Sequence, residues 1–274
     1  MKKLLLSFIL FLFINVAFSA KVDTVYVQSK SMNKLIPNLI VTPDNYTNQK
    51  EHFPVLYLLH GAGNDYTEWT KYISLADYAN KYNFIIVCPD GGRTSWYFDS
   101  PVDSTMKYET YISSELVGFI DANYRTISNR NKRAIAGLSM GGHGALYLGI
   151  RHQDVWGAAG SMAGGVDIRP FPNNWDIAKR LGTYSQSPEN WENNTVINQL
   201  YLLNGKNMSL LFDCGNSDFF CDANRRLHQQ MLERNIPHTY IERPGGHELE
   251  YWKVTIKYQL FFFNEFFTTI DNKK

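Results

Sequence analysis

A serine flanked by glycines, in the segment Gly137-Leu138-Ser139-Met140-Gly141, constrains this chain more than any other feature. The apolar run 132–136 before it predicts a buried strand, and the small residues 142–150 after it predict a helix. A serine on so sharp a turn must adopt a strained backbone, and glycines on either side remove Cβ clashes. The pattern therefore predicts an α/β fold with Ser139 exposed above the sheet. A glycine-rich turn without catalytic meaning is the alternative interpretation.

A reactive serine needs a base and an acid, and the chain offers both downstream. A serine hydroxyl is a poor nucleophile at neutral pH, so a histidine must take its proton and a carboxylate must orient that histidine. The apolar run 209–212 predicts a strand followed by a loop with two aspartates, and the run 239–242 predicts a strand followed by His247. Because open α/β sheets place their sites beyond strand carboxyl ends, these loops are expected to meet Ser139.

Two aspartates compete for the role of acid, Asp213 at the strand end and Asp218 in the loop beyond it. Asp218 is favoured because it follows Gly215, where a carboxylate can turn toward a neighbouring loop. Asp213 can instead cap the loop through backbone N–H groups. Among the histidines after the serine, His247 alone lies on a glycine-rich loop at the expected edge. The predicted triad is Ser139, His247 and Asp218, with Asp213 as the alternative acid.

Negative charge on a reacting carbonyl oxygen requires preorganised N–H donors, which form an oxyanion hole. One donor is expected to be the backbone amide of Met140, the residue after the nucleophile. The other is expected from the loop 60–64, which follows the predicted strand 54–59 and contains two glycines. Ala62 is the predicted donor, and His60 is expected to shape this loop rather than act as the base.

Four motifs together closely resemble the esterase D family. They are Gly-Leu-Ser-Met-Gly-Gly-His-Gly-Ala-Leu at 137–146, Tyr-Leu-Leu-His-Gly-x-Gly at 57–63, Pro-Asp-Gly-Gly at 89–92 and Pro-Gly-Gly-His at 244–247. That family includes S-formylglutathione hydrolases, feruloyl esterases, acetyl esterases and mycolyltransferases, and the resemblance covers about 22–267. It implies an α/β-hydrolase without a cofactor, in which the nucleophile, acid, base and two oxyanion donors are Ser139, Asp218, His247, Ala62 and Met140.

The order of strands and helices predicted along the chain fits an α/β-hydrolase fold with a mostly parallel sheet of about eight strands and helices on both faces. Residues 20–274 are expected to form one catalytic domain, since the length suits a single core. The predicted strands are 24–28, 35–42, 54–59, one ending at Cys88, 132–136, 155–161, 208–212 and 238–242. The predicted helices include 73–82, 106–122, 142–150 and 249–267.

A segment at about 164–207, between the sixth and seventh strands, is expected to form a small cap-like insertion over the site. It is rich in proline and aromatic residues, among them Trp175. A second aromatic group, Trp96 and Tyr97, follows another predicted strand end. Aromatic faces stack on sugars and on aromatic acyl groups alike. Trp96, Tyr97 and Trp175 are therefore the predicted substrate-binding residues, and packing of a long loop is the alternative interpretation for the first two.

The first 19 residues predict a secretory signal peptide. Lys2 and Lys3 precede an apolar block at 4–13, and small residues at 17 and 19 mark a cleavage site. The block is too short for a comfortable membrane span of about 20 residues. We therefore expect export to the periplasm or the extracellular space, with no membrane attachment after cleavage.

Charge and cysteine content narrow the partners. Without Lys2 and Lys3, the 27 basic residues become 25 against 26 acidic ones, so no basic surface for nucleic acid or anionic membrane is expected. The three cysteines lack the spacing of a zinc site, and no metal is predicted. Cys214 and Cys221 bracket Asp218 closely enough that a disulfide stays an open question.

The sequence thus predicts a secreted serine carboxylesterase that removes feruloyl or acetyl groups from plant cell-wall carbohydrate through a Ser-His-Asp triad and an acyl-enzyme. Two alternatives remain: an acyltransferase to a sugar acceptor, and a noncatalytic carbohydrate-binding protein on a hydrolase fold. The acyl group, the sugar and the oligomeric state do not follow from the sequence.

Overall fold

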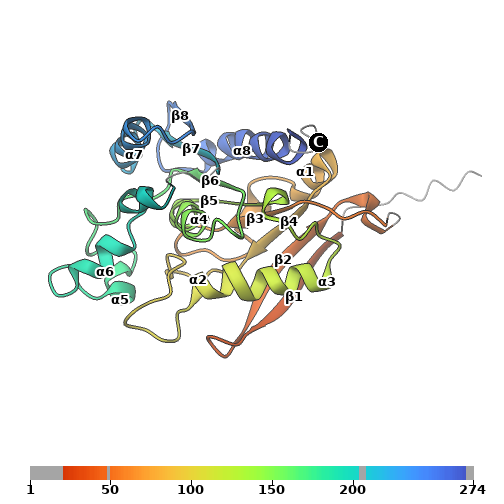
Figure 1. Cartoon of the computed structure of the whole chain (residues 1–274), viewed down its shortest axis with the longest axis horizontal. Helices are drawn as coiled ribbons and strands as arrows, with labels where there is room; N and C mark the ends of the chain where they lie inside the picture. The colour runs from red at the N-terminus through yellow and green to blue at the C-terminus, as the bar shows by residue number, and fades with distance from the viewer. Residues whose placement is uncertain (1–20, 48–49, 204–207, 270–274) are drawn as a thin grey trace, which may run out of the picture.

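The computed structural model describes residues 21–47, 50–203 and 208–269 and has a central sheet between layers of helices (Figure 1). The predicted signal peptide, residues 1–19, lies outside the described residues and stays a prediction. The strands are β1 (Lys21–Ser29), β2 (Lys34–Thr42), β3 (Val55–Leu59), β4 (Ile85–Pro89), β5 (Arg133–Leu138), β6 (Ala158–Met162), β7 (Ser209–Gly215) and β8 (Thr239–Arg243).

The described strands form one sheet in the order β1-β2-β4-β3-β5-β6-β7-β8. β1 pairs antiparallel with β2, β2 pairs antiparallel with β4, and all the other neighbours pair in parallel. The mostly parallel, eight-stranded α/β-hydrolase sheet expected from the sequence is confirmed. Its parallel part brings the carboxyl ends of β3, β5, β7 and β8 to one edge, where the functional loops emerge.

Helices cover both faces of the sheet, because the central strands bury side chains on each side. In β3, Tyr57 and Leu59 belong to one core cluster, and Leu56 and Leu58 belong to the other. The first cluster includes residues of α4 and α7, and the second includes residues of α1 and α8. The α-helices are α1 (Leu75–Tyr82), α2 (Tyr108–Thr110), α3 (Val117–Asn123), α4 (Met140–Arg151), α5 (Ile177–Leu181), α6 (Pro188–Asn193), α7 (Cys221–Glu233) and α8 (Leu249–Thr269).

Shorter helical turns complete the described chain. A π-helical turn, η3 (Tyr111–Leu116), joins α2 to α3, so the single helix predicted over 106–122 is present with a wider central turn. The 3₁₀ turns are η1 (Asp44–Thr47), η2 (Glu68–Lys71), η4 (Arg130–Lys132) and η5 (Val196–Leu203). The strand predicted from residue 155 begins only at Ala158, because the amides of Val155 and Trp156 both donate to the His152 carbonyl in a turn.

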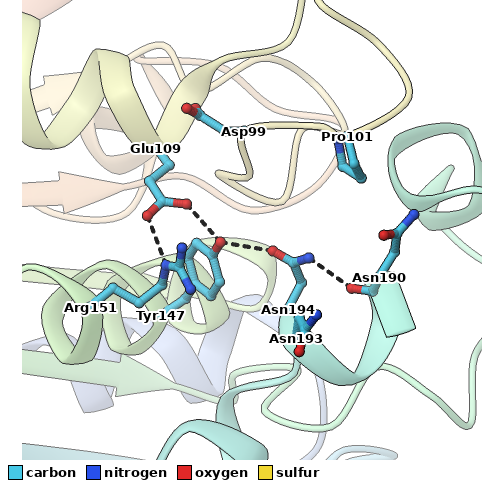
Figure 2. Close-up of a pocket in the computed structure, with 8 residues that line it drawn as sticks. All are labelled: Asp99, Pro101, Glu109, Tyr147, Arg151, Asn190, Asn193 and Asn194. Carbon is cyan, nitrogen blue, oxygen red and sulfur yellow. Dashed lines mark hydrogen bonds and ion pairs between the residues drawn. The ribbon is translucent and has the colours of Figure 1, made fainter. Parts of the chain in front are cut away.

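The segment between β6 and β7 holds α5, α6 and η5 and projects to one side of the sheet (Figure 1). Its buried residues Ile177, Leu181 and Trp191 join the same core cluster as α4. Where this segment meets the carboxyl end of α4, Glu109, Tyr147 and Arg151 point toward one another beside a polar pocket (Figure 2). The insertion is therefore packed as part of the domain core, and its cap-like role stays a prediction.

The three cysteines are free and buried, so the Cys214–Cys221 bridge left open by the sequence is not formed in this structure. Of the helices in the described part of the chain, none combines the length and apolarity needed to cross a bilayer.

Candidate active site

Ser139 occupies a strained turn between β5 and α4. Its φ is 53° and its ψ is −116°, a conformation that costs about 1–3 kcal/mol for a residue with a Cβ. A Cβ at Gly137 would lie 2.3 Å from the Gly141 carbonyl oxygen, and a Cβ at Gly141 would lie 2.6 Å from the His60 carbonyl oxygen. Only glycine fits at either position, so the motif is required by close backbone packing. The Ser139 amide donates to the Met162 carbonyl at 2.9 Å, which fixes the turn above the sheet.

The structure brings Ser139, His247 and Asp218 into one hydrogen-bonded chain. His247 Nε2 lies 2.9 Å from Ser139 Oγ, and His247 Nδ1 lies 2.7 Å from Asp218 Oδ2. The Asp218 side chain is fully buried, whereas the His247 side chain is 16% exposed. With neutral imidazole, Nδ1–H donates to the carboxylate and Nε2 accepts the serine proton, which is the arrangement a general base requires.

The loops that carry the acid and the histidine are joined to each other. The Ser217 amide donates to the Gly245 carbonyl at 3.0 Å, and the Asn216 amide donates to the Arg243 carbonyl at 2.9 Å. The second Asp218 oxygen, Oδ1, accepts the Phe220 amide at 2.8 Å. Asp218 is therefore held at both oxygens, and its distance to the His247 ring is set by backbone contacts.

Aromatic rings surround His247 on several sides. The Phe219 ring centroid is 4.4 Å from the imidazole centroid, and the Phe220 centroid is 5.5 Å away. Trp252, from the first turn of α8, meets the imidazole edge-on at 5.0 Å. These contacts limit rotation of the ring, so the imidazole is oriented by packing as well as by Asp218.

Both expected oxyanion donors lie beside Ser139. A Cβ on Gly61 would lie 3.7 Å from the Ser139 Cβ, which places the loop after β3 against the serine. Met140 is the first residue of α4, so its amide belongs to the unpaired first turn of the helix. Within the described residues, the amides of Ala62 and Met140 donate to no protein acceptor. Both amides therefore lack a protein acceptor, and their role as oxyanion donors stays a prediction.

The loop after β3 is held in place by a buried carboxylate whose role was not predicted from the sequence. Glu68 is 1% exposed, and its Oε2 accepts the Gly61 amide at 2.7 Å. Its Oε1 accepts Asn64 Nδ2 at 2.5 Å and the Tyr72 hydroxyl at 2.6 Å. Glu68 therefore fixes the residue before Ala62, and only its spacing of seven residues from Gly61 could have indicated this in the sequence.

His60 shapes this loop and does not reach Ser139. Its Nδ1 lies 2.8 Å from the Gly61 carbonyl oxygen, and its Nε2 accepts the Gly91 amide at 2.9 Å. Burial lowers the pKa of His60, which fits a neutral ring that donates at one nitrogen and accepts at the other.

Asp213 is placed away from the triad. Its Oδ2 accepts Gln259 Nε2 from α8 at 3.1 Å, and burial raises the pKa of its carboxyl to about 6. The loop-capping role considered for Asp213 is wrong, because its side chain is buried and points toward α8. The alternative acid is thereby unable to contact His247, whose Nδ1 is already paired with Asp218.

Two of the three predicted substrate-binding aromatics are buried, which contradicts direct substrate contact. Tyr97 is 0% exposed, and its hydroxyl donates to the His60 carbonyl at 3.0 Å, beneath the oxyanion loop. Trp96 is 1% exposed, and its ring packs edge-on against His143. Both residues have positive φ, 56° at Trp96 and 62° at Tyr97, and this turn directs the rings inward. They position neighbouring loops instead.

The third residue, Trp175, is half-buried. It belongs to a group of three packed aromatic side chains, Phe171, Trp175 and Phe219, which we call the aromatic wall. The wall contacts the triad through Phe219. Trp175 stacks on Phe219 at 5.7 Å and 22°, and Phe171 packs on Trp175 at 5.4 Å. Phe219 is 50% exposed and contacts His247. Phe219 was not predicted from the sequence, although its position directly after Asp218 was the available signal.

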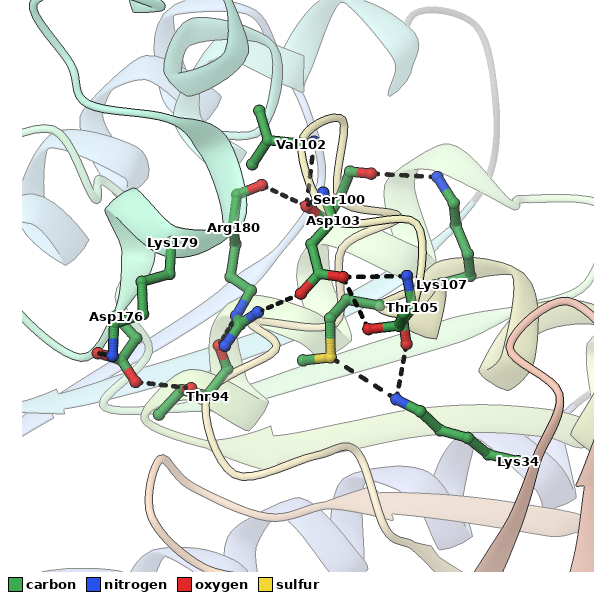
Figure 3. Close-up of polar contacts among 11 residues, drawn as sticks. Lys34, Thr94, Ser100, Val102, Asp103, Thr105, Lys107, Asp176, Lys179 and Arg180 are labelled. Carbon is green, nitrogen blue, oxygen red and sulfur yellow. Dashed lines mark hydrogen bonds and ion pairs between the residues drawn. The ribbon is translucent and has the colours of Figure 1, made fainter.

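Polar contacts hold the wall in place by tying α5 to the loop that carries Trp96 (Figure 3). Arg180 Nη1 forms an ion pair with Asp103 at 2.9 Å, and Ser100 Oγ donates to the Arg180 carbonyl at 2.6 Å. Trp96 Nε1 donates to the Trp175 carbonyl at 3.2 Å. The insertion and the 94–107 loop therefore form one rigid border of the site.

In residues 21–47, 50–203 and 208–269, no group of three or more His, Cys, Asp or Glu side chains is arranged to hold a metal ion.

Comparison with known proteins shows which family this chain is similar to. The Esterase family model matches residues 29–263. An esterase of Mycobacterium tuberculosis is 29% identical over 236 residues, 76% of this chain and 51% of the relative, so the chain spans about half the length of that protein. An acetyl esterase of Caldicellulosiruptor saccharolyticus is 24% identical over 243 residues, 82% of this chain and 91% of the relative. The solved structure of a ferulic acid esterase is 31% identical, with a TM-score of 0.77, and the match covers 91% of this chain and 100% of that one.

Proposed function

Because this chain belongs to the Esterase family, as its motifs predicted, we propose that it is a serine carboxylic ester hydrolase acting on acylated carbohydrate. The observation that carries the proposal is the hydrogen-bonded chain from Ser139 through His247 to Asp218. Export after cleavage of residues 1–19 is part of the same proposal, and it rests on the sequence pattern alone.

In the first half-reaction, Ser139 Oγ attacks the ester carbonyl while His247 Nε2 takes the hydroxyl proton. The 2.9 Å separation of the two atoms is within the range for direct proton transfer. Asp218 keeps the proton on Nδ1 and stabilises the imidazolium that forms. The alcohol then leaves with the proton that His247 returns, and an acyl-serine remains.

The oxyanion of the tetrahedral intermediate is assigned to the amides of Ala62 and Met140. Neither amide must break a protein hydrogen bond to receive it among the described residues. A single preorganised donor of this kind contributes about 10²–10³-fold to turnover. Water then attacks the acyl-serine with His247 as base, and the same amides stabilise the second intermediate.

The acyl group that the site favours is an aromatic one, with feruloyl as the leading candidate and acetyl as the second. The wall of Phe171, Trp175 and Phe219 supports this order, because Phe219 is 50% exposed and contacts His247. Aromatic pairs contribute about 0.5–1.5 kcal/mol beyond area burial. The names of the acetyl esterase and ferulic acid esterase relatives are compatible with either acyl group.

The test measures kcat/KM on methyl ferulate and on acetylated xylo-oligosaccharide, with Ser139→Ala as the blank. Ser139→Ala is expected to lower turnover by at least about 10³-fold, and fluorophosphonate should label the unaltered chain but not this variant. Phe219→Ala is expected to lower kcat/KM for methyl ferulate by about tenfold and to leave the acetylated substrate nearly unchanged. Phe261→Ala, which removes a ring of similar exposure (56%) on α8, is the matched control.

Three results would count against the proposal. Labelling of Ser139 with no hydrolysis but with transfer to a sugar hydroxyl would favour the acyltransferase alternative. Absence of labelling in a folded protein would favour a noncatalytic carbohydrate-binding protein. Equal losses of kcat/KM for methyl ferulate in Phe219→Ala and Phe261→Ala would show that the aromatic wall does not recognise the acyl group.

A further inference from the structure

A polar groove lies at the end of α4 opposite to Ser139. Two adjoining cavities form it, of about 280 Å³ and 430 Å³, and Arg151 and Asn193 line both. The first lies between α4, α6 and the loop at residue 99 (Figure 2). The second lies between α4, α6 and η5. Nothing in the mechanism above uses these residues, so the groove needs an explanation of its own.

Five of the twelve residues that line the groove carry side-chain amides, which can both donate and accept hydrogen bonds. Asn193 is exposed, and its side chain has no protein partner among the described residues. Gln199 is 3% exposed, and its Oε1 has no hydrogen-bond partner there. That oxygen is enclosed, and Gln199 Nε2 donates to the Asn193 carbonyl at 2.9 Å. The other amide groups of the groove already donate to protein oxygens, so the Asn193 side chain is the one open to a ligand among the described lining residues. The amide residues of the groove are Asn190, Asn193, Asn194, Asn198 and Gln199.

A buried carboxylate makes the floor of the groove rigid. Glu109 is 7% exposed, and its Oε1 contacts Arg151 Nε at 2.7 Å and His152 Nε2 at 2.8 Å. The Tyr147 hydroxyl lies 2.7 Å from Glu109 Oε2 and 2.8 Å from Asn194 Oδ1 (Figure 2). Burial alone would raise the pKa of the Glu109 carboxyl, but the hydrogen bonds from His152, Arg151 and Tyr147 hold it at about 2. The network is thus charged and preformed at neutral pH.

The charge of the groove excludes anionic ligands. Among the lining residues, Asp99, Glu109 and Glu192 contribute three carboxylates against the guanidinium of Arg151, which Glu109 already engages. Arg169 pairs with Glu192 from outside the lining at 2.8 Å, which still leaves more carboxylates than guanidinium groups. Both Asp99 oxygens accept hydrogen bonds from Thr110, so that carboxylate is not free for a metal. A phosphate or acidic polymer would meet net repulsion here. A neutral ligand with hydroxyl groups meets no such repulsion and can form hydrogen bonds with the exposed Asn193 amide.

The groove also offers an exposed aromatic face. Tyr201 in η5 is 61% exposed and lines the second cavity. A tyrosine ring presents an apolar face together with a polar tip, which suits the alternating apolar and hydroxyl surfaces of a pyranose. Amide side chains beside an exposed ring form a more specific combination than either feature alone.

We propose that this groove is a second carbohydrate-binding site, which takes a neutral oligosaccharide chain through the amide of Asn193 and the ring of Tyr201. The site is remote from the triad: α4 begins next to Ser139 and ends at Arg151, so its 12 residues separate the two by about 18 Å. The same insertion supplies Trp175 to the active site and Asn193 to the groove.

The use of the groove rests on the proposed function. A polysaccharide held there keeps its ester-bearing units near Ser139 and raises their effective concentration. Small soluble esters cannot reach both places, so they gain nothing from it.

Binding is tested by titration calorimetry of the full chain carrying Ser139→Ala with xylohexaose, cellohexaose and mannohexaose. Saturable binding of at least one sugar is expected, with a Kd below about 5 mM. The double substitution Asn193→Ala and Tyr201→Ala is expected to weaken that Kd by at least about tenfold. Tyr26→Ala removes a tyrosine of matching exposure (59%) on β1 and should leave the Kd unchanged.

Hydrolysis assays separate this inference from the proposed function. In the active enzyme, the double variant should keep its kcat/KM on methyl ferulate and lose at least about fivefold on a polymeric acylated xylan. Sugar binding with no hydrolysis of any ester would overturn the proposed esterase function and support the carbohydrate-binding site. Hydrolysis with no saturable sugar binding, or equal binding by the double variant, would overturn the groove alone.

Discussion

Replacing Glu68 by alanine is expected to lower kcat by about 10- to 100-fold while KM changes little. Glu68 touches no substrate, because it is buried beneath the loop that follows β3. Its Oε2 accepts the Gly61 amide at 2.7 Å, one residue before the proposed oxyanion donor Ala62. Without that contact the loop loses its anchor, and the Ala62 amide no longer points at the developing charge.

The magnitude follows from what the loop contributes. Loss of an entire oxyanion donor costs about 10²–10³-fold in turnover, and a displacement of about 1 Å costs up to about 10²-fold. Ala62 remains present in the variant, so the lower part of this range applies. KM is expected to hold because the oxyanion contact strengthens only in the transition state.

The assay compares kcat and KM of Glu68→Ala and Glu68→Gln on methyl ferulate. In the glutamine variant, the carbonyl oxygen can still accept the Gly61 amide, and the NH₂ group can donate to the Tyr72 hydroxyl. The hydrogen bond from Asn64 Nδ2 is lost, because that donor would then face the NH₂ group. Glu68→Gln should therefore stay within about fivefold of the original kcat, the cost of about one neutral hydrogen bond. Ile120→Ala, a buried change in α3 far from the site, controls for lost stability.

The reasoning fails if folded Glu68→Ala keeps more than half of its kcat. It also fails if Ile120→Ala, at a matched unfolding temperature, loses as much activity as Glu68→Ala. A loss confined to KM would show that the loop binds substrate and does not stabilise the oxyanion.

Two further expectations concern carboxylates. Asp218→Asn should lower kcat by about 10³–10⁴-fold, because His247 then loses the acceptor for its Nδ1 proton, whereas Asp213→Asn should keep kcat within about tenfold; similar losses in both variants would return Asp213 to the role of acid. The pKa of Glu109 is lower in the folded chain than its ordinary 4.5, so the stability it contributes is present above pH 4.5 and lost as pH falls toward about 2. Urea unfolding across that window should show a shallower decline for Glu109→Gln than for the unaltered chain, and parallel curves would contradict the assignment.

Much of the sheet and the triad geometry followed from the sequence because each depends on local pattern. Apolar runs of five or six residues mark strands buried on both faces, and the carboxyl ends of such strands share one edge. The glycines around Ser139 were readable because backbone packing at Gly137 and Gly141 admits no side chain. These signals need no knowledge of which side chains meet across the fold.

The errors arose where side-chain direction decides the role. Trp96 and Tyr97 were expected at the pocket because they follow a strand end, yet two successive residues with positive φ turn their rings into the core. Phe219 was missed because its exposure depends on the loop that holds Asp218. A left-handed backbone at two successive non-glycine residues is uncommon, and no short sequence pattern in this chain predicts it.

The alternation of side chains along β7 is enough to decide which of the two aspartates can be the catalytic acid. In β7, Leu210, Phe212 and Cys214 belong to the core cluster on one face of the sheet. Side chains alternate along a strand, so Asp213 must point to the opposite face, where Gln259 of α8 receives it. An acid that contacts His247 has to rise from the strand end instead of from either face, and only a residue in the following loop is free to do so. The alternation of apolar residues at 210, 212 and 214 therefore excludes Asp213 independently of any motif, and the same parity argument applies to any acidic residue inside a strand buried on both faces.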